Sequence, residues 1–365
     1  PKPRSTPATK GTNSAYRYPY WLAISKRSPG LFSRAHSTGK GLSTRVAQSD
    51  TLERRQNTEN GEIAFMLKLL ALTLAFFVVP AFADSSDTRS SDVNPYKITV
   101  LSTNISDYGG LGEWSFAALF EGEHESVLFD TGFRSDTVLH NVLHLGIDLA
   151  PVSKVVLSHF HGDHTGGLLV LREHFKKANP TALSEVYVAK GFFDQRQTAD
   201  GRLVGPGDFK SAAEFKKAAE HIGISFTIVE SPVEIAPALW LTGPVPRKIE
   251  AYNGPDGLFV ATKSGLDKDI IKDDQSLGYL TNKGWLMTSG CGHSGLMNTG
   301  EVLQNIKPAP VYSILGGFHL WKADKTTLDK TALWLKSAGL DLMVGGHCTG
   351  IGAAEHISTQ LAIPR

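Results

Sequence analysis

The segment His159–His164 constrains this chain more than any other, because it places three histidines and an aspartate within six residues. It follows the apolar run Val152–Ser158, which predicts a buried strand that presents the cluster at the edge of a sheet. His159 and His161 stand two positions apart, so an extended backbone points both rings to one side. Gly162 allows the turn after them. Imidazole nitrogens and a carboxylate are typical ligands of Zn²⁺ and neighbouring transition metals, so the segment predicts a metal site.

Glycine-flanked histidines follow three later predicted strands and are candidates for the ligands that the local cluster does not supply. These are His293, His319 and His347. We expect His293 and His347 to bind metal, and His319 either to bind metal or to contact substrate. Arg247 is a second candidate substrate contact, for an anionic group, with a surface arginine as the alternative. The predicted metal ligands are His159, His161, Asp163, His164, His293 and His347.

This ligand set predicts hydrolytic chemistry with one or two divalent ions. Such ions activate water as a nucleophile near neutral pH and polarise the carbonyl or phosphoryl oxygen of a substrate. We predict that Asp163 is the catalytic residue, acting as a metal ligand, a proton shuttle or both. If Asp163 binds metal, its availability as a base falls.

Strand and helix patterns alternate along the chain from Lys97 to Val344. Runs rich in β-branched and aromatic residues indicate strands at residues 97–101, 115–120, 126–130, 152–158, 185–189, 225–230, 276–281, 284–289, 311–315 and 340–344. Helices are indicated at residues 136–145, 211–221 and 326–338. This pattern favours an α/β fold in which helices cover a sheet-containing core. The mixed-charge run Lys263–Asp274 is predicted to be a solvated loop near the site.

The charge balance and the cysteine count argue against several classes of protein. Lys and Arg number 37 against 36 Asp and Glu, which gives a formal net charge of +1. Bulk electrostatics therefore give no reason to expect a nucleic-acid partner. Two cysteines, Cys291 and Cys348, are too few for a disulfide scaffold. We expect a small-molecule substrate, and the sequence does not indicate an oligomeric state.

The N-terminal part of the chain differs in composition from the rest. Residues 1–65 are polar and basic without an apolar period, which predicts a disordered leader. Residues 66–83 have the layout of a signal peptide, with Lys68 near the start and a small-x-small cleavage site after Ala83. The apolar run is shorter than the roughly 20 residues that span a bilayer, so no stable membrane span is expected after cleavage. Residues 84–96 are predicted to be a linker to a domain at 97–365.

The signal peptide pattern predicts a periplasmic or secreted protein. Because such a peptide acts at an N-terminus, we expect translation to start at Met66 and residues 1–65 to lie outside the native product. An uncleaved anchor or a buried helix is the alternative for residues 66–83. A transit peptide is the alternative for the leader, although Glu53, Glu59 and Glu62 interrupt its basic composition.

The histidine cluster resembles the His-x-His-x-Asp-His signature of the metallo-β-lactamase superfamily, and the resemblance extends from about Lys97 to Thr349. It implies a four-layer αββα sandwich and a metal-dependent hydrolase. The run Leu128–Gly132 resembles the strand-end motif whose aspartate orients the metal loop in that superfamily. Asp130 is therefore predicted to contact a metal ligand rather than the metal.

Four later motifs resemble one branch of the superfamily, which includes the archaeal dihydropteroate-synthase-like enzyme of methanopterin biosynthesis. They are Asp273–Leu277, Gly290–His293, Gly316–Leu320 and His347–Gly350. Many bacterial members of this branch are described as metal-dependent hydrolases. The archaeal member implies an alternative, which is a transferase acting on a pterin or a phosphorylated substrate.

One position departs from the superfamily pattern. The Gly-Asp pair whose carboxylate usually bridges two metals is not evident late in the chain, and Gly290-Cys291 stands in a similar strand-end context. Either Cys291 replaces the carboxylate, or His293 serves one metal and no protein bridge exists. A thiolate favours Zn²⁺. In an oxidising compartment, Cys291 and Cys348 are alternatively expected to form a disulfide.

The leading prediction is an exported metal-dependent hydrolase that acts on an ester, lactone, amide or phosphoester, with Zn²⁺ as the favoured ion. The alternatives are the transferase, a β-lactamase, and a metal-binding or redox protein without hydrolytic activity. An intact Asp163 and a nearly complete ligand set argue against the last of these.

Overall fold

The computed structural model describes residues 95–251 and 255–364. The predicted leader, the signal peptide and the linker up to residue 94 lie outside the described residues. No helix among the described residues is long and apolar enough to cross a membrane.

The first sheet is built from the N-terminal half of the domain, and its strands lie side by side in the order of the sequence. The first three strands pair antiparallel, and the last three continue the sheet in parallel. The six strands are β1 (Lys97–Ser102), β2 (Ala117–Glu121), β3 (Ser126–Phe129), β4 (Lys154–Val156), β5 (Glu185–Ala189) and β8 (Ser225–Val229). The carboxyl ends of β3 and β4 therefore meet at one edge of this sheet.

The second sheet has the order β16-β15-β14-β13-β10-β9. Its strands are β9 (Val233–Ala236), β10 (Leu239–Leu241), β13 (Ser276–Thr281), β14 (Gly284–Ser289), β15 (Val311–Gly316) and β16 (Leu342–Gly345). The β13–β14 pair is antiparallel, whereas β14, β15 and β16 run parallel. Three consecutive carboxyl ends therefore lie next to one another at one edge of this sheet.

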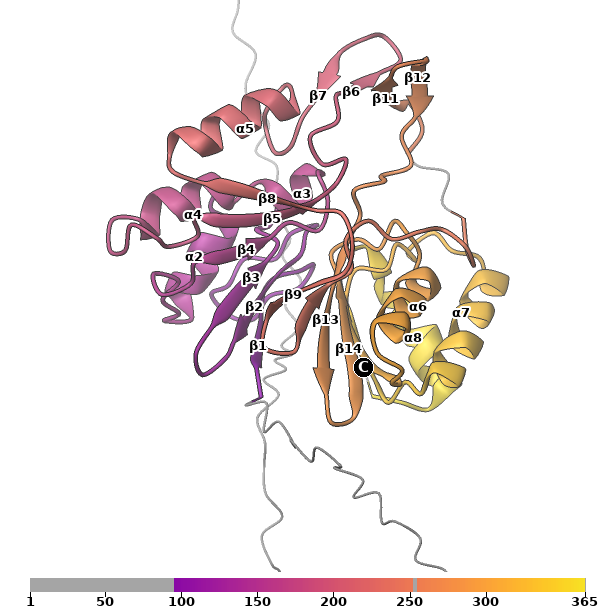
Figure 1. The fold of residues 1–365 in the computed structure, drawn as a ribbon. Coiled ribbons are helices and arrows are strands. Elements are labelled where there is room, and N and C mark those ends of the chain that lie inside the picture. Colours follow the sequence, from indigo (N-terminus) through magenta and orange to yellow (C-terminus); the bar gives the residue numbers. More distant parts are fainter. Residues whose placement is uncertain (1–94, 252–254, 365) are drawn as a thin grey trace, which may run out of the picture. The chain divides into compact units, whose positions relative to one another are not determined.

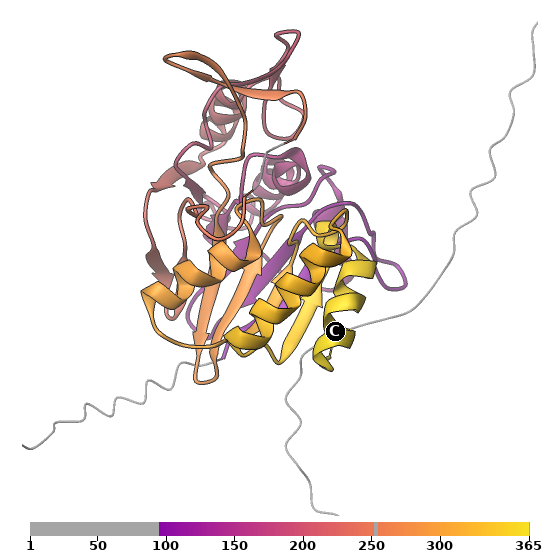
Figure 2. The same cartoon turned by 90° about the vertical axis from the view of Figure 1, so that its right-hand side faces the viewer.

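The two sheets pack face to face and helices cover both outer faces, which confirms the four-layer αββα sandwich (Figures 1 and 2). The helices on the first sheet are α2 (Thr137–His144), α4 (Leu168–Phe175) and α5 (Ala212–His221). Those on the second sheet are α6 (Leu296–Ile306), α7 (Lys325–Ala338) and α8 (Ile351–Leu361). Short α3 (Gly162–Thr165) and the 3₁₀ turn η1 (His347–Thr349) lie in the loops that carry the histidines.

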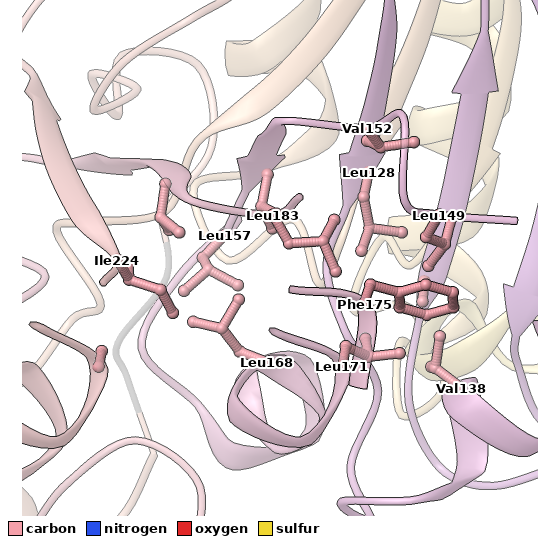
Figure 3. Packing of buried hydrophobic residues seen from close by; sticks show 14 of the residues in the cluster. Leu128, Val138, Leu149, Val152, Leu157, Leu168, Leu171, Phe175, Leu183 and Ile224 are labelled. Carbon is pink, nitrogen blue, oxygen red and sulfur yellow. The ribbon is translucent and has the colours of Figure 1, made fainter. Parts of the chain in front are cut away.

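Three apolar layers hold these four layers together. Phe116, Phe129 and Leu277 belong to the layer between the sheets. Leu128 and Leu171 belong to the layer between the first sheet and its helices, shown in Figure 3. The alternation of Leu128 and Phe129 toward opposite faces is the two-residue period of a strand that is buried on both sides.

A small third sheet corrects one prediction. It consists of β6 (Arg196–Thr198), β7 (Leu203–Val204), β11 (Leu258–Thr262) and β12 (Gly265–Lys268). The run Lys263–Asp274, predicted to be a solvated loop, contains exposed β12 but then turns inward. Asp269 and Asp273 are buried and form ion pairs with buried Arg196. The cationic partner, distant in the sequence, is what makes burial of these carboxylates tolerable.

Each predicted strand and helix is present, and its boundaries lie within two residues of the predicted ones. The strand predicted at 152–158 is regular over β4 alone, and its end has a local cause. The backbone N–H of Ser158 donates to Asp130 Oδ1 instead of continuing the ladder. The predicted strand therefore ends where the site begins.

We expect Leu128→Ala to destabilise the domain by about 2–5 kcal/mol, because it leaves a cavity between the first sheet and its helices. Urea unfolding followed by circular dichroism measures the change. Leu143→Ala, at an exposed position of α2, is the control and should change stability by no more than about 0.5 kcal/mol. Equal effects of the two substitutions would contradict this account of the core.

Candidate metal centre

The candidate ligands gather where the carboxyl ends of strands from both sheets meet. The cluster His159–His164 follows β4, His293 follows β14, His319 follows β15 and His347 follows β16. Open α/β sheets commonly bind ligands beyond the carboxyl ends of their parallel strands, since the loops there converge on one edge. The structure therefore brings together all six predicted metal ligands and His319.

One triad consists of His159, His161 and His293, whose candidate ligand atoms lie within 4.8 Å of one another. His159 Nε2 is 2.9 Å from His161 Nδ1. The ring centroid of His293 lies 4.8 Å from that of His159 and 5.0 Å from that of His161. The two-residue spacing of His159 and His161 does place both rings at one site.

A second triad consists of Asp163, His164 and His347. Asp163 Oδ2 lies 3.7 Å from His164 Nε2 and 3.4 Å from His347 Nε2. The two ring nitrogens are 3.2 Å apart. His164 and His347 are fully buried, whereas the Asp163 side chain is 22% exposed. Asp163 is therefore the member of this triad that faces the open side of the site.

Cys291 lies beside both triads. Its Sγ belongs to one candidate ligand group with His159 and His164 and to another with His347 and Cys348. It is 3.6 Å from His347 Nε2 and 3.5 Å from His319 Nδ1. Among the described residues, Asp163 is the only carboxylate in any such group. Cys291 therefore shares candidate ligand groups with members of both triads.

The donor set fits divalent transition metals. Zinc takes imidazole, carboxylate and thiolate ligands at about 2.0–2.3 Å, so two ligand atoms of one ion lie at most roughly twice that distance apart. The ligand atoms of Asp163, His164 and His347 lie 3.2–3.7 Å apart, inside this limit, and those of His159, His161 and His293, all within 4.8 Å of one another, lie close to it.

Burial sets the charge of these side chains. Desolvation, together with neighbouring histidines, holds the pKa of His159 and of His293 well below the usual range. Burial also lowers the pKa of His161 to about 4. The three imidazoles of the first triad are therefore neutral at physiological pH, which is the form that binds a metal.

His164 behaves differently because two carboxylates face it. Burial alone would lower its pKa, but the charges of Asp163 and Asp130 and a hydrogen bond to Asp130 raise that pKa to about 9. Surroundings that favour a proton on this ring also favour a cation beside it. The second triad thus provides negative potential where the first provides neutral nitrogen donors.

Asp130 positions the ligand loop, as its strand-end place predicts. This buried carboxylate accepts hydrogen bonds from Ser158 N (2.7 Å), Ser158 Oγ (2.8 Å) and His164 Nδ1 (2.8 Å). Its backbone has a φ of 56°, an uncommon conformation for a residue with a side chain. A Cβ at Gly290 would lie 2.4 Å from Asp130 Oδ2, so glycine is required there for this packing.

Asp273 and Asp274 hold the loops that carry candidate ligands, a role that the sequence did not predict. Asp273 Oδ2 accepts the backbone N–H of Phe160 at 2.9 Å, which fixes the first ligand loop. Asp274 Oδ2 accepts the backbone N–H of Ser294 at 2.7 Å, which fixes the loop that carries His293. Their signal in the sequence is a pair of adjacent aspartates that Gln275 separates from the following strand, β13.

Arg196 supports the same loop from the small third sheet. It donates to Asp269 Oδ2 at 2.7 Å and to Asp273 Oδ1 at 2.5 Å. Its guanidinium carbon lies 3.7 Å from the centre of the Phe160 ring. The segment between the candidate ligands His159 and His161 is thus held by a carboxylate bonded to its backbone and by a guanidinium stacked on the ring of Phe160.

The two candidate substrate contacts have different surroundings. The His319 ring centroid lies 4.5 Å from that of His293, so His319 borders the first triad. Arg247 Nη2 donates to the carbonyl oxygens of Ile270 (2.5 Å) and Ile271 (2.8 Å). These bonds support the backbone that leads to Asp273. The role of either residue toward substrate stays a prediction.

An aromatic wall stands beside the second triad. The ring of Trp114 lies 5.2 Å from that of His347 and 5.4 Å from that of Trp321, edge to face in both cases. Each tryptophan is 46% exposed. Lys322 Nζ lies 4.1 Å from the centre of the Trp321 ring. Phe318, by contrast, is buried within the core of the second sheet.

Trp114 belongs to the loop at residues 103–116 between β1 and β2. Asn141 of α2 holds this loop, accepting from Leu111 N and donating to Leu111 O and Leu101 O. Glu113 accepts hydrogen bonds from Phe133 N and Arg134 N. Trp114 is therefore carried by a loop that contributes no member of either triad.

Comparison with known proteins identifies the same superfamily by two routes. The metallo-beta-lactamase superfamily matches residues 115–297. A solved structure described as a metal-dependent hydrolase of the beta-lactamase superfamily superposes with a TM-score of 0.60 at 28% identity. That alignment covers 74% of this chain and 94% of the other.

Two proteins of Methanocaldococcus jannaschii are similar in sequence. One, an uncharacterized protein, is 32% identical over 265 residues, which are 72% of this chain and 93% of the relative. The other is 28% identical over 238 residues, 64% of this chain and 78% of the relative. It is named 7,8-dihydropterin-6-methyl-4-(beta-D-ribofuranosyl)-aminobenzene-5'-phosphate synthase.

We expect Asp130→Asn to weaken zinc binding about 10- to 100-fold, because an amide has one oxygen acceptor where three donors converge. Competition against a chromophoric chelator measures the affinity, and circular dichroism checks the fold. Asp136→Asn, at an exposed aspartate without a side-chain capping bond, is the matched control. Zinc affinity equal to that of the unchanged chain would show that Asp130 does not orient the site.

Proposed function

Because this chain belongs to the metallo-β-lactamase superfamily, we propose that its two triads act together to hydrolyse an ester, lactone, amide or phosphoester bond. Metal-dependent hydrolysis is the general activity of the superfamily. The observation that carries the proposal is the meeting of two complete triads, with Cys291 beside both, where the strand ends of the two sheets come together. Such paired sites can hold the attacking and the leaving group of one reaction.

The proposed ligand assignment follows the two triads. His159, His161 and His293 would hold one divalent ion, and Asp163, His164 and His347 a second, with Cys291 between them. Bound ions of this kind supply Lewis-acid polarisation of the substrate and activation of water. A set of imidazoles with a thiol is the basis for proposing Zn²⁺.

Asp163 is the proposed proton carrier. Its carboxylate is partly exposed while the two histidines of its triad are fully buried. Because Oδ2 is the oxygen that faces His164 and His347, Asp163 would hold the ion through Oδ2 and accept or pass a proton at its other oxygen, Oδ1. His164 is fixed by Asp130 through its other ring nitrogen, so Asp163 carries the proton without moving the ligand beside it.

The aromatic wall supports a substrate with a flat or apolar group. Anything held at the second triad would lie against Trp114, because this ring contacts His347. Large exposed aromatic side chains beside a buried polar centre are typical of ligand recognition. Lys322, over the ring of Trp321, places a positive charge at the far side of the wall for an anionic substituent.

A transferase or synthase reaction is the second candidate. It is favoured by one observation, which is that a relative covering 64% of this chain is named as a synthase that makes a phosphorylated pterin compound. An assay on esters, lactones, β-lactams and phosphodiesters separates the two, because transfer requires a second organic substrate and hydrolysis only water. Turnover that depends on such a second substrate would favour the synthase.

We also propose that the mature protein is exported to the periplasm or secreted. The support is the signal peptide pattern at residues 66–83 with its cleavage site after Ala83. N-terminal sequencing of protein from separated cell fractions would test the proposal. A mature chain that retains residues 66–83 in the cytoplasm would contradict it.

We expect His161→Ala to lose bound zinc from the first triad, and Asp163→Ala to reduce hydrolysis by roughly 10²–10⁴-fold. The measurements are metal content by plasma mass spectrometry and turnover on the substrate panel. His124→Ala, which changes an exposed histidine of the β2–β3 turn, should leave both values unchanged. Full metal content and full turnover in both site variants would refute the assignment.

We expect Trp114→Ala to raise KM about 2- to 10-fold for aryl esters while zinc content stays constant, because the substrate loses an aromatic contact. Alkyl esters of the same acid should be affected less. Leu333→Ala, at an exposed position of α7, is the control for general surface effects. A fall in kcat with unchanged KM would mean that Trp114 acts through His347 rather than on the substrate.

A further inference from the structure

The two cysteines of this 365-residue chain meet inside the candidate metal centre. Cys291 follows β14 and Cys348 lies in η1 after β16, on either side of the loop that follows β15. Their Sγ atoms are 3.0 Å apart, and both are free thiols. Their residues are 4% and 2% exposed. A contact between two side chains 57 positions apart is a product of the fold and not of local sequence.

The surrounding backbone holds the pair in contact. Cys348 Sγ donates to the carbonyl oxygen of Cys291 at 3.4 Å and accepts from the backbone N–H of His319 at 3.3 Å. A Cβ at Gly317 would lie 2.9 Å from Cys348 Sγ, so the sulfur packs directly against the backbone that follows β15. A disulfide has an S–S distance of about 2.05 Å, which requires the two atoms to approach by about 1 Å.

Cys291 has two uses that exclude each other. Its Sγ lies within ligand distance of His159 and His164 on one side and of His347 on the other. A sulfur committed to an S–S bond is no longer a thiolate donor, and closing that bond moves it toward Cys348. Metal binding and disulfide formation therefore compete for one atom.

We propose that Cys291 and Cys348 form a reversible disulfide in the metal-free protein, and that this disulfide prevents zinc from entering the site. The proposal rests on the metal-holding part of the proposed function and not on the reaction or its substrate. By linkage, bound zinc protects the thiols from oxidation to the same degree that the disulfide weakens zinc binding.

The chemistry balances with a small hydroperoxide as oxidant, which suits thiols that are nearly buried. One sulfur attacks a peroxide oxygen, the O–O bond breaks, and a sulfenic acid and one water result. The second sulfur then attacks the sulfenic sulfur, an S–S bond forms, the S–O bond breaks, and a second water leaves. The two cysteines together lose two electrons and two protons, and hydrogen peroxide becomes two waters. A dithiol reductant reverses the change by thiol–disulfide exchange.

The experiment compares the metal-free and zinc-loaded forms of the whole chain after treatment with hydrogen peroxide and removal of the excess with catalase. Free thiols are counted with a maleimide after unfolding, intact mass is measured, and zinc content is determined after dialysis against zinc. In the metal-free form we expect both thiols to disappear with a mass loss of about 2 Da. We also expect zinc uptake to fall at least tenfold and to return with dithiothreitol, whereas the zinc-loaded form should keep both thiols.

Cys348→Ser is the matched variant, because it removes the partner sulfur and keeps Cys291. It should show neither the mass loss nor a dithiol-reversible loss of zinc uptake. Two results on the unchanged chain would overturn the proposal, and neither depends on the variant. One is a disulfide that leaves zinc uptake intact, and the other is persistence of both thiols in the metal-free folded form under conditions that oxidise them after unfolding. Coupling of zinc and thiols without any hydrolysis would contradict the proposed function and leave this inference standing.

Discussion

A buried carboxylate, Asp130, joins the ends of two neighbouring strands and sets the geometry from which the rest of the site follows. It accepts three hydrogen bonds, two from Ser158 and one from His164. Because the Ser158 backbone bonds to this carboxylate, β4 ends there and the chain turns into the ligand loop. Because His164 is held by its Nδ1, its other nitrogen faces Asp163 and His347. Because the Asp130 side chain is fully buried, these three hydrogen bonds offset the hydration that it loses on folding.

Two other buried aspartates, Asp273 and Asp274, also accept backbone N–H groups of the loops that carry the histidines. Asp273 holds the backbone of Phe160, and Asp274 holds the backbone of Ser294. Burial raises the pKa of Asp274 to about 6, although the hydrogen bonds from Ser294 and the charge of Arg247 act in the opposite direction. Burying such groups costs stability, and the three apolar layers of the sandwich offset that cost. The loops are therefore fixed before any ion arrives.

The sequence predicted most strands of the two large sheets and the loops that carry the histidines. It did not predict which aspartates hold those loops. Runs such as Ser276–Thr281 and Glu185–Ala189 are strands as predicted, since their β-branched and aromatic residues occur in short blocks between turn residues. The six-residue motif and two glycine-flanked histidines led to both triads. Helices α4, α6 and α8 were missed because the N-cap of each is a glycine, which offers no capping side chain. The interior position of Asp273 was missed because its partner Arg196 is 77 residues away, and spacing along a chain does not reveal an ion pair formed by folding.

The loop at residues 103–116 carries Trp114 beside the candidate site and contributes no member of either triad. The loop is bonded to Asn141, to the backbone of Phe133 and Arg134 and, through Thr103 Oγ1, to the backbone N–H of His347, and its Trp114 ring contacts the His347 ring. Changing the residues of this segment beyond Thr103 would alter the surroundings of the candidate site while the buried carboxylates keep their hydrogen bonds to the histidine loops. Substitutions confined to those residues can therefore change substrate contacts during evolution while the buried hydrogen bonds of the histidine loops are kept.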